Sequence, residues 1–345
     1  MNIDILTEEQ RELLLSIISN NERFVIVGHK NPDGDAIGSC LGFAGYLRDI
    51  HGKEVAVVVP DAYPDFLHWV PESHTIVRYD KRPDEVQTLL DNADVVCCLD
   101  LNVLSRTDQM EEPLAACKAK KVLIDHHLGP DMDTVLTVSH PEMSSTCELL
   151  FRIIWQLGDF EKLSRKWAEQ IYCGMMTDTG GFTFNSTRPE IFFIISQILT
   201  KGIDKDKIYR NVFHNYSQWA VRLRGYLMAQ KLNYYEDLHA SFFALSRMEM
   251  EEYHFIKGDI EGLVNVPLTI KGLKLSISLR EDSKLDNTVW VSLRSVDDFP
   301  CNEVAAQFFN GGGHLNASGG RLNCSLEEAC QIAKQAIKAW ADRLK

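Results

Sequence analysis

The chain has 345 residues. A single hydrophobic core rarely supports a chain of this length, so two domains are expected. Hydrophobic residues make up 45% and charged residues 25%, which excludes a disordered or low-complexity chain. The formal net charge of -13 argues against non-specific binding of duplex DNA, because the mean field of the protein repels a polyanion.

The sequence contains no pattern typical of secretion or of a membrane span. Its first residues are acidic and lack a charged-then-apolar signal pattern. The most apolar stretch, 191–199, is about half the length that a membrane helix needs. The nine cysteines form no CxxC pair, and we interpret them as reduced thiols. These features predict a cytoplasmic protein without a membrane partner.

Short apolar runs alternate with helical sequence in the first half of the chain. A helix is expected over 36–52, where periodic apolar residues end at a glycine. The runs are almost continuously hydrophobic, which is typical of parallel strands covered on both faces. They predict an α/β fold with a doubly wound, mainly parallel sheet. The runs expected to form strands are 24–28, 54–59, 94–100 and 121–125.

The pattern changes twice in the second half. Residues 187–235 look mainly helical, and from about 239 alternating runs predict strands that are followed by helices. Ser325 and Glu328 form a capping-box pattern at the start of the last helix. We therefore expect a smaller α+β domain after a helical linker. The predicted limits are a metal-binding catalytic domain over 1–200, a linker over 201–236 and a substrate-binding domain over 237–345.

Aspartates and histidines fall where the apolar runs end. In α/β sheets functional groups collect beyond the carboxyl ends of strands. A single Asp or His in such a place is usually a cap or a surface residue, but here four segments bring such residues to one edge. That many carboxylates need a counter-charge, which divalent cations supply. The residues at these ends are His29, Asp33, Asp35, Asp100, Asp125, His126, His127 and Asp178.

This mixture of ligands is suited to two metal ions. Two ions about 3.5–4 Å apart need a bridging carboxylate and further terminal ligands. Asp and His without Cys favour manganese over structural zinc, with magnesium or cobalt as alternatives. A bridging water that loses its proton at neutral pH would then attack phosphorus in line. The sequence thus predicts hydrolysis of a phosphate ester.

The segments resemble the DHH phosphoesterase family over the whole chain. The N-terminal motifs occur in the order of the family, and the last hundred residues look like the DHH-associated domain. One motif would only be suggestive, whereas all of them in register are highly specific. The matching segments are GHKNPDGDAIGS (28–39), CLDLN (98–102), DHH (125–127), SSTCELL (144–150), MTDTGGF (176–182), VSLRS (291–295) and GGGHLNASGG (311–320).

The resemblance implies a role for each of the clustered residues. The first metal would be bound by His29, Asp33 and Asp100. The second would be bound by Asp35, Asp100, His126 and Asp178, with Asp100 as the bridge. Asp125 would orient a neighbouring imidazole. His127 would lie close to the scissile phosphate and stabilise charge or assist proton transfer to the leaving oxygen.

Several residues are expected to bind substrate, each with a plainer alternative. The GGGH loop, 311–314, is either a flexible surface loop or, together with Arg294, a phosphate clamp. Ser145 and Thr146 either contact substrate or cap the following helix. The substrate-binding residues that we predict are Arg106, Ser145, Arg294, Gly312, Gly313 and His314, and Arg280 and Arg321 are weaker candidates.

Within the family, the chain is most similar to the nano-RNase/pAp phosphatase branch. That resemblance implies hydrolysis of short oligonucleotides to 5′-mononucleotides and of pAp to AMP, and a homodimer. An active edge in a cleft between two domains would also favour small substrates. The alternatives are a hydrolase of cyclic or linear dinucleotides, one of pyrophosphate or polyphosphate, and a nucleotide-binding regulator without catalysis.

Overall fold

The computed structural model describes residues 2–345, which divide into two compact units between Asn215 and Tyr216. The first unit contains a six-stranded sheet of order β3-β2-β1-β4-β5-β6. All of its strand pairs are parallel. The strands are β1 (Arg23–Val27), β2 (Glu54–Val59), β3 (Val77–Arg78), β4 (Val95–Leu99), β5 (Lys120–Asp125) and β6 (Leu136–Ser139).

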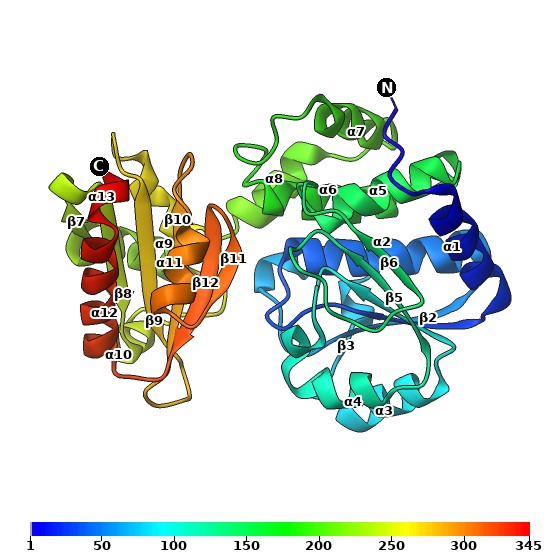
Figure 1. Cartoon of the computed structure of the whole chain (residues 1–345), viewed down its shortest axis with the longest axis horizontal. Coiled ribbons are helices and arrows are strands. Elements are labelled where there is room, and N and C mark those ends of the chain that lie inside the picture. Colours follow the sequence, from blue (N-terminus) through cyan, green and yellow to red (C-terminus); the bar gives the residue numbers. More distant parts are fainter. Residues whose placement is uncertain (1) are drawn as a thin grey trace. The chain divides into compact units, whose positions relative to one another are not determined.

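Helices cover both faces of this sheet (Figure 1). One core packs the sheet against α1, α2, α5 and α6, and a smaller one packs it against α3 and α4. The helices of this unit are α1 (Glu8–Asn20), α2 (Gly34–His51), α3 (Pro83–Asn92), α4 (Glu111–Ala116), α5 (Thr146–Gln156), α6 (Arg165–Asp178), α7 (Pro189–Thr200) and α8 (Lys205–Phe213). The short 3-10 helices are η1 (Asp65–Leu67), η2 (Ser73–Thr75), η3 (Leu104–Met110) and η4 (Phe160–Lys162).

The order of the strands reverses between β1 and β4, which are neighbours in the sheet. In open α/β sheets, ligands bind outside the carboxyl ends of the strands at such a switch point. The chain leaves β1 through His29 and enters α2, whose N-cap is Asp33. It leaves β4 through Asp100. The fold therefore brings the first two Asp/His segments of the sequence to the switch point.

Two glycines allow α2 and α6 to pack closely. A Cβ on Gly38 would lie 2.5 Å from the Gln170 carbonyl oxygen of α6, and one on Gly174 would lie 3.1 Å from Asp35 Cα of α2. Both distances are below van der Waals contact with backbone atoms, so neither position accepts a side chain without movement of the backbone. This approach brings the end of α6, and with it Asp178, to the start of α2.

The second unit is a mixed six-stranded sheet of order β11-β12-β10-β9-β8-β7. Only the β8–β9 pair is parallel. One face packs against α11 and α12, and part of the other face against α9, α10 and η7. The strands are β7 (Asn233–Tyr235), β8 (Ala240–Leu245), β9 (Leu275–Glu281), β10 (Val289–Ser295), β11 (Gly312–His314) and β12 (Ala317–Leu322). The helices are α9 (Gln218–Tyr226), η5 (Leu227–Lys231), η6 (Glu236–Leu238), α10 (Arg247–Glu252), η7 (Leu263–Thr269), α11 (Cys301–Phe308), α12 (Leu326–Ala339) and α13 (Ala341–Leu344).

The predicted fold class is confirmed: a mainly parallel, doubly wound sheet is followed by a smaller α+β unit. Each of the four runs expected to form strands in the first half overlaps one, to within one residue at either end. The expected helix over 36–52 begins two residues earlier, at Gly34, because Asp33 caps it. Within residues 2–345, none of the helices combines the length and the apolar character that a membrane span requires. The nine cysteines are free thiols.

Candidate metal centre

The Asp100 carboxylate lies at the centre of the Asp/His cluster. Its Oδ2 atom is 3.4 Å from His29 Nε2, and its Oδ1 atom is 3.5 Å from His126 Nε2. Asp100 is almost fully buried, and its backbone has a φ of 60°, a left-handed conformation that is uncommon for residues other than glycine. Unusual backbone geometry of this kind is concentrated at functional sites. One buried carboxylate thus faces two imidazoles that come from different strand ends.

His29 and Asp33 lie on one side of Asp100. His29 Nδ1 is 2.7 Å from the carbonyl oxygen of Lys30 and donates a hydrogen bond to it, which leaves Nε2 unprotonated in the neutral ring. Nε2 is buried, makes no hydrogen bond, and lies 3.8 Å from Asp33 Oδ2. A buried nitrogen without a hydrogen-bond partner beside two carboxylates is a suitable position for a metal ligand.

His126, Asp35 and Asp178 lie on the other side. His126 Nε2 is 3.3 Å from Asp178 Oδ2 and 3.8 Å from Asp35 Oδ2. Its Nδ1 atom lies 3.2 Å from the carbonyl oxygen of Met143, which orients the ring. In an octahedral site with bonds of about 2.1 Å, neighbouring ligand atoms are about 3 Å apart. The observed separations are slightly longer, so modest closure would complete such a site.

Asp125 contacts His127 twice. The backbone N–H of His127 donates to Asp125 Oδ2 at 3.0 Å, and His127 Nδ1 lies 2.8 Å from Asp125 Oδ1. Asp125 is fully buried, while the His127 side chain is partly exposed. His127 Nδ1 also lies 3.6 Å from Asp100 Oδ1, so the ring stands beside the cluster.

The electrostatics of the cluster favour a cation. Burial raises the pKa of the Asp35 carboxyl well above its usual value, and the charges of Asp100 and Asp178 raise it further. Burial lowers the pKa of His29, but Asp100 and Asp33 outweigh this effect and raise it to about 10. Without a metal, protonated imidazoles supply the positive charge that these carboxylates need. A divalent cation would supply the same positive charge and leave the imidazoles neutral. The residues present therefore fit a metal centre.

Arg106 and Ser145 differ in their surroundings. Arg106 Nη1 is buried without a hydrogen-bond partner, and the Arg106 carbonyl accepts from the Lys30 N–H at 2.8 Å, next to His29. An unpaired buried guanidinium nitrogen is a suitable donor to an anion. Ser145 is fully buried and its hydroxyl accepts from the Glu148 N–H at 3.0 Å, so it caps α5. Arg106 thus keeps a donor for a ligand, whereas the Ser145 hydroxyl oxygen already serves as the helix cap.

In the second unit, Arg294 and His314 lie on the same face of the sheet. Ala317 on β12 pairs with Arg294 on β10 and with His314 on β11. Residues directly opposite in a ladder point to the same face, and two strand spacings separate the outer pair by roughly 10 Å. Gly312 and Gly313 continue β11 and are exposed. The expected clamp is thus a pleated strand edge rather than an irregular loop.

A further row of paired residues crosses this face of the second unit. Trp290 on β10 pairs with Arg280 on β9 and with Arg321 on β12. The Arg321 guanidinium lies over the Trp290 ring, 5.5 Å from its centroid. The face therefore combines cationic and aromatic groups, which suits phosphate and base contacts.

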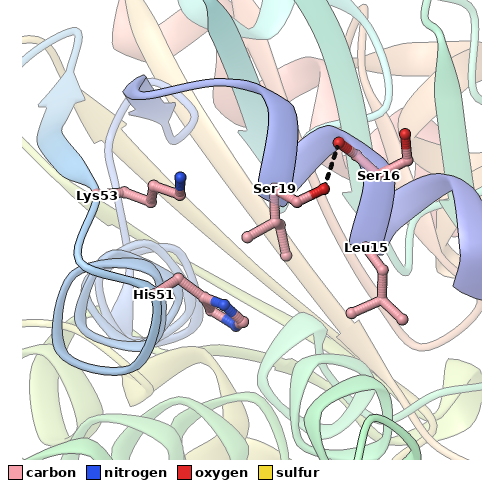
Figure 2. Close-up of a pocket in the computed structure, with 6 residues that line it drawn as sticks. Leu15, Ser16, Ser19, His51 and Lys53 are labelled. Atoms are coloured by element: carbon pink, nitrogen blue, oxygen red, sulfur yellow. Dashed lines mark hydrogen bonds between the residues drawn. The ribbon is translucent and has the colours of Figure 1, made fainter.

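A separate cavity of about 400 Å³ lies elsewhere in the first unit, between α1, the end of α2 and the start of β2 (Figure 2). His51 and Lys53 line it opposite Ser16 and Ser19 of α1. His51 is sixteen residues after Asp35 on the same helix, so the cavity is roughly 24 Å from the cluster along the helix axis. It takes no part in the metal centre.

The sequence did not reveal several backbone groups of the site. The carbonyl oxygens of Lys30 and Met143 accept from His29 and His126, and the α5 amides contact Asp35. A main-chain group is the same in every residue, so no residue type indicates it. The only signal in the sequence for the contacts between the α5 amides and Asp35 is the SSTC segment, which begins just before α5.

The first unit is thus a doubly wound α/β domain with an Asp/His cluster at its switch point. Residues 23–175 match the model of the DHH family, N-terminal domain. The first unit therefore contains the N-terminal domain of the DHH family, a family of phosphoesterase hydrolases.

Two curated relatives cover most of the chain. The bifunctional oligoribonuclease and PAP phosphatase NrnA of Bacillus subtilis is 26% identical over 92% of this chain and 95% of its own length. The protein of the same name from Thermus thermophilus is 28% identical over 91% of this chain and 88% of its own length. The cyclic-di-AMP phosphodiesterase GdpP of Bacillus subtilis is 24% identical over 95% of this chain, but over 49% of its own length.

Solved structures show the same fold. An exopolyphosphatase-related protein from Bacteroides fragilis is 47% identical, with a TM-score of 0.93 over 99% of this chain and 98% of that chain. RecJ from Thermus thermophilus, solved in complex with Mn²⁺, is 14% identical with a TM-score of 0.55 over 99% of this chain and 56% of its own. The RecJ likeness is one of fold alone.

Proposed function

We propose that the protein hydrolyses short oligonucleotides to 5′-mononucleotides, and pAp to AMP, with two divalent metal ions at the Asp100 cluster. The observation that carries this proposal is the position of Asp100, whose two oxygens face His29 and His126 at 3.4 and 3.5 Å. A carboxylate that presents one oxygen to each of two ligand groups has the geometry of a bridge. The names of the relatives support the substrate class.

The proposed ligands form two sets around Asp100. His29, Asp33 and Asp100 would hold one ion, and Asp35, Asp100, His126 and Asp178 would hold the other. The four carboxylates carry a formal charge that two divalent ions would neutralise. Oxygen and imidazole ligands without thiolate favour Mn²⁺, with Mg²⁺ or Co²⁺ as alternatives. Such ions supply the charge that activates water and stabilises the phosphoryl group.

The remaining polar groups would bind and orient the substrate. Arg106, with a buried and unpaired Nη1, would bind a phosphoryl oxygen beside His29. Asp125 fixes His127 through Nδ1, so proton transfer to the leaving oxygen would fall to Nε2. In the second unit, Arg294 and His314 with the Gly312–Gly313 edge would bind a phosphate group of the ligand.

The test is a comparison of substrates with the purified protein and Mn²⁺. A trinucleotide, pAp, cyclic di-AMP and polyphosphate are incubated in parallel, and the products are separated by ion-exchange chromatography. Release of mononucleotide from the trinucleotide and of AMP from pAp is expected. The Asp100→Asn variant controls for contaminating nucleases, since it keeps the size of the side chain. No release from either substrate would disprove the proposal.

A second candidate is hydrolysis of polyphosphate, favoured by the 47% identity to a protein described as exopolyphosphatase-related. The same experiment separates the two, because polyphosphate releases orthophosphate only. Turnover of cyclic di-AMP alone would instead favour a cyclic-dinucleotide hydrolase, and binding without turnover a regulator. Location in the cytoplasm, a homodimer and the lack of duplex DNA binding stay predictions.

A further inference from the structure

A short segment that supplies none of the proposed ligands contacts three of them. The Thr146 and Cys147 backbone N–H groups donate to Asp35 Oδ2 at 2.6 Å and Oδ1 at 2.9 Å. The Thr146 hydroxyl donates to Asp100 Oδ1 at 3.0 Å. The Met143 carbonyl lies against His126. Residues 143–147 therefore form a bracket, the name we use for this segment, along one side of the cluster.

We propose that Thr146 is a positioning residue that fixes the Asp35 and Asp100 carboxylates relative to one another for metal binding. It is the one residue of the bracket that contacts both, Asp35 through its backbone and Asp100 through its side chain. The inference rests on the proposed metal function of the cluster. Groups behind the first ligands typically change metal affinity by about 10–100-fold when they are removed.

The two carboxylates need such a restraint. Asp35 is fully buried and close to the charges of Asp100 and Asp178, so it must be held against repulsion. The amide groups at the start of α5 stabilise its negative charge, as helix N-termini do. Asp100 sits on a left-handed backbone, and the Thr146 hydroxyl limits the rotation of its carboxylate. Each oxygen of Asp35 accepts one amide hydrogen bond from α5 and keeps a second lone pair for a metal ion.

Glu148 holds the bracket in place through hydrogen bonds to Ser144. The fully buried Glu148 carboxylate accepts from the Ser144 N–H at 2.8 Å and the Ser144 hydroxyl at 2.7 Å. Arg152 Nη2 and Arg188 Nη2 each donate to it at 2.7 Å. Arg188 follows Asp178 in the chain, so this pair also joins the Asp178 segment to the bracket. A buried network with several partners has little freedom to move.

The hydrogen bond of the Thr146 hydroxyl is not needed to start the helix α5. Ser145 is the N-cap of α5 and already accepts from the Glu148 N–H. A threonine at the next position has no capping role to perform. Its hydroxyl instead donates to a carboxylate 46 residues earlier in the chain. The contact is therefore with the cluster and not with the helix.

The experiment compares Thr146→Val, Thr146→Ala and Thr146→Ser in the full chain. Mn²⁺ binding is measured by isothermal titration calorimetry and by the electron paramagnetic resonance spectrum of bound Mn²⁺. Val and Ala remove the hydroxyl, and at least one binding step is expected to weaken by about 10-fold or more. Ser restores the donor, and its affinities are expected within about 3-fold of the wild type. Thr288→Val is the control: it also removes a buried threonine hydroxyl, but one that donates to the backbone carbonyl of Asp286 in the second unit.

The outcomes separate this inference from the proposed function. A wild-type chain that binds no Mn²⁺, Mg²⁺ or Co²⁺ would overturn the proposed function. A wild-type chain that binds Mn²⁺, with equal affinities and spectra in the Val and Ala variants, would overturn the role of Thr146 alone. A Ser variant as weak as Val would also overturn it, because the methyl group and not the hydroxyl would then be decisive. Circular dichroism of each variant confirms folding, and Ala serves if the Val variant does not fold.

Discussion

Asp125 binds both the ring and the backbone of His127, with its two oxygens 2.8 Å from Nδ1 and 3.0 Å from the backbone nitrogen. In Asp125→Asn, one acceptor oxygen becomes an NH2 group, so only one of the two hydrogen bonds that hold His127 can remain and the ring is less firmly oriented. We expect kcat to fall by about 100-fold, the lower range for the loss of general acid–base assistance, with little change in KM. Steady-state kinetics on the trinucleotide measure this. Unchanged Mn²⁺ affinity is the control, and an unchanged kcat would contradict the assignment.

Asp100→Asn is expected to abolish the stabilisation of the protein by metal. Binding to the folded state alone raises stability by about 2.7 kcal/mol at a free Mn²⁺ concentration 100 times the Kd. The wild type should therefore unfold at a higher temperature in Mn²⁺ than in EDTA. The variant lacks the proposed bridge and should show the same Tm in both. Differential scanning fluorimetry measures the four values, and an equal rise in the variant would count against the bridge.

Arg106→Ala should weaken substrate binding and leave metal binding intact. The guanidinium Nη1 is buried without a partner, so it can donate to a phosphoryl oxygen without breaking an existing bond. Loss of one such charge-assisted hydrogen bond corresponds to about 2 kcal/mol, or roughly a 30-fold rise in KM. Arg106→Lys should recover part of this loss. A change in Mn²⁺ affinity instead of KM would show that Arg106 supports the cluster.

Glu148→Gln should destabilise the protein, since it leaves two arginines without their carboxylate. Arg152 is buried, and its contacts with Glu148 lie inside the core. Removing one member of a buried ion pair typically costs about 3–5 kcal/mol. Glu169→Gln is the matched control, because Glu169 pairs with an exposed Arg165 on the surface of α6 and its loss should cost less than about 1 kcal/mol. Urea unfolding measures both, and similar losses would contradict the stabilising role assigned to Glu148.

The contribution of Glu249, in the second unit, to the free energy of unfolding depends on pH. Burial opposes ionisation of Glu249, but Lys231, Ser246 and Tyr226 outweigh it and lower its pKa from the usual 4.5 to about 2. Because the folded pKa is lowered, its contribution is complete above pH 4.5 and is lost as the pH falls towards 2. Glu249→Gln should cost about 2 kcal/mol at pH 7 and progressively less below pH 4.5. Urea unfolding at pH 7, 5 and 3 tests this, and a pH-independent difference would contradict it.

The strand ends were predictable from the sequence because a buried parallel strand is almost wholly apolar, so the first polar residue after it marks the edge of the sheet. This reasoning located His29, Asp100 and His126. Asp178 also follows an apolar run, but the structure shows that this run is the helix α6. Its position beside Asp35 depends on the close packing of α2 and α6, which requires small residues at Gly38 and Gly174. Apolar runs alone do not encode such contacts between distant segments.

The wide spacing of the clustered residues along the chain has a consequence for biosynthesis. His29 leaves β1 at the beginning of the first unit, whereas Asp178 ends α6 near its close. A nascent chain that has emerged only as far as β6 therefore has most of the carboxylates but lacks the residue that completes the second set. Tight binding of ions at the second set would then begin only once α6 has docked on α2, before α7 and α8 complete the unit.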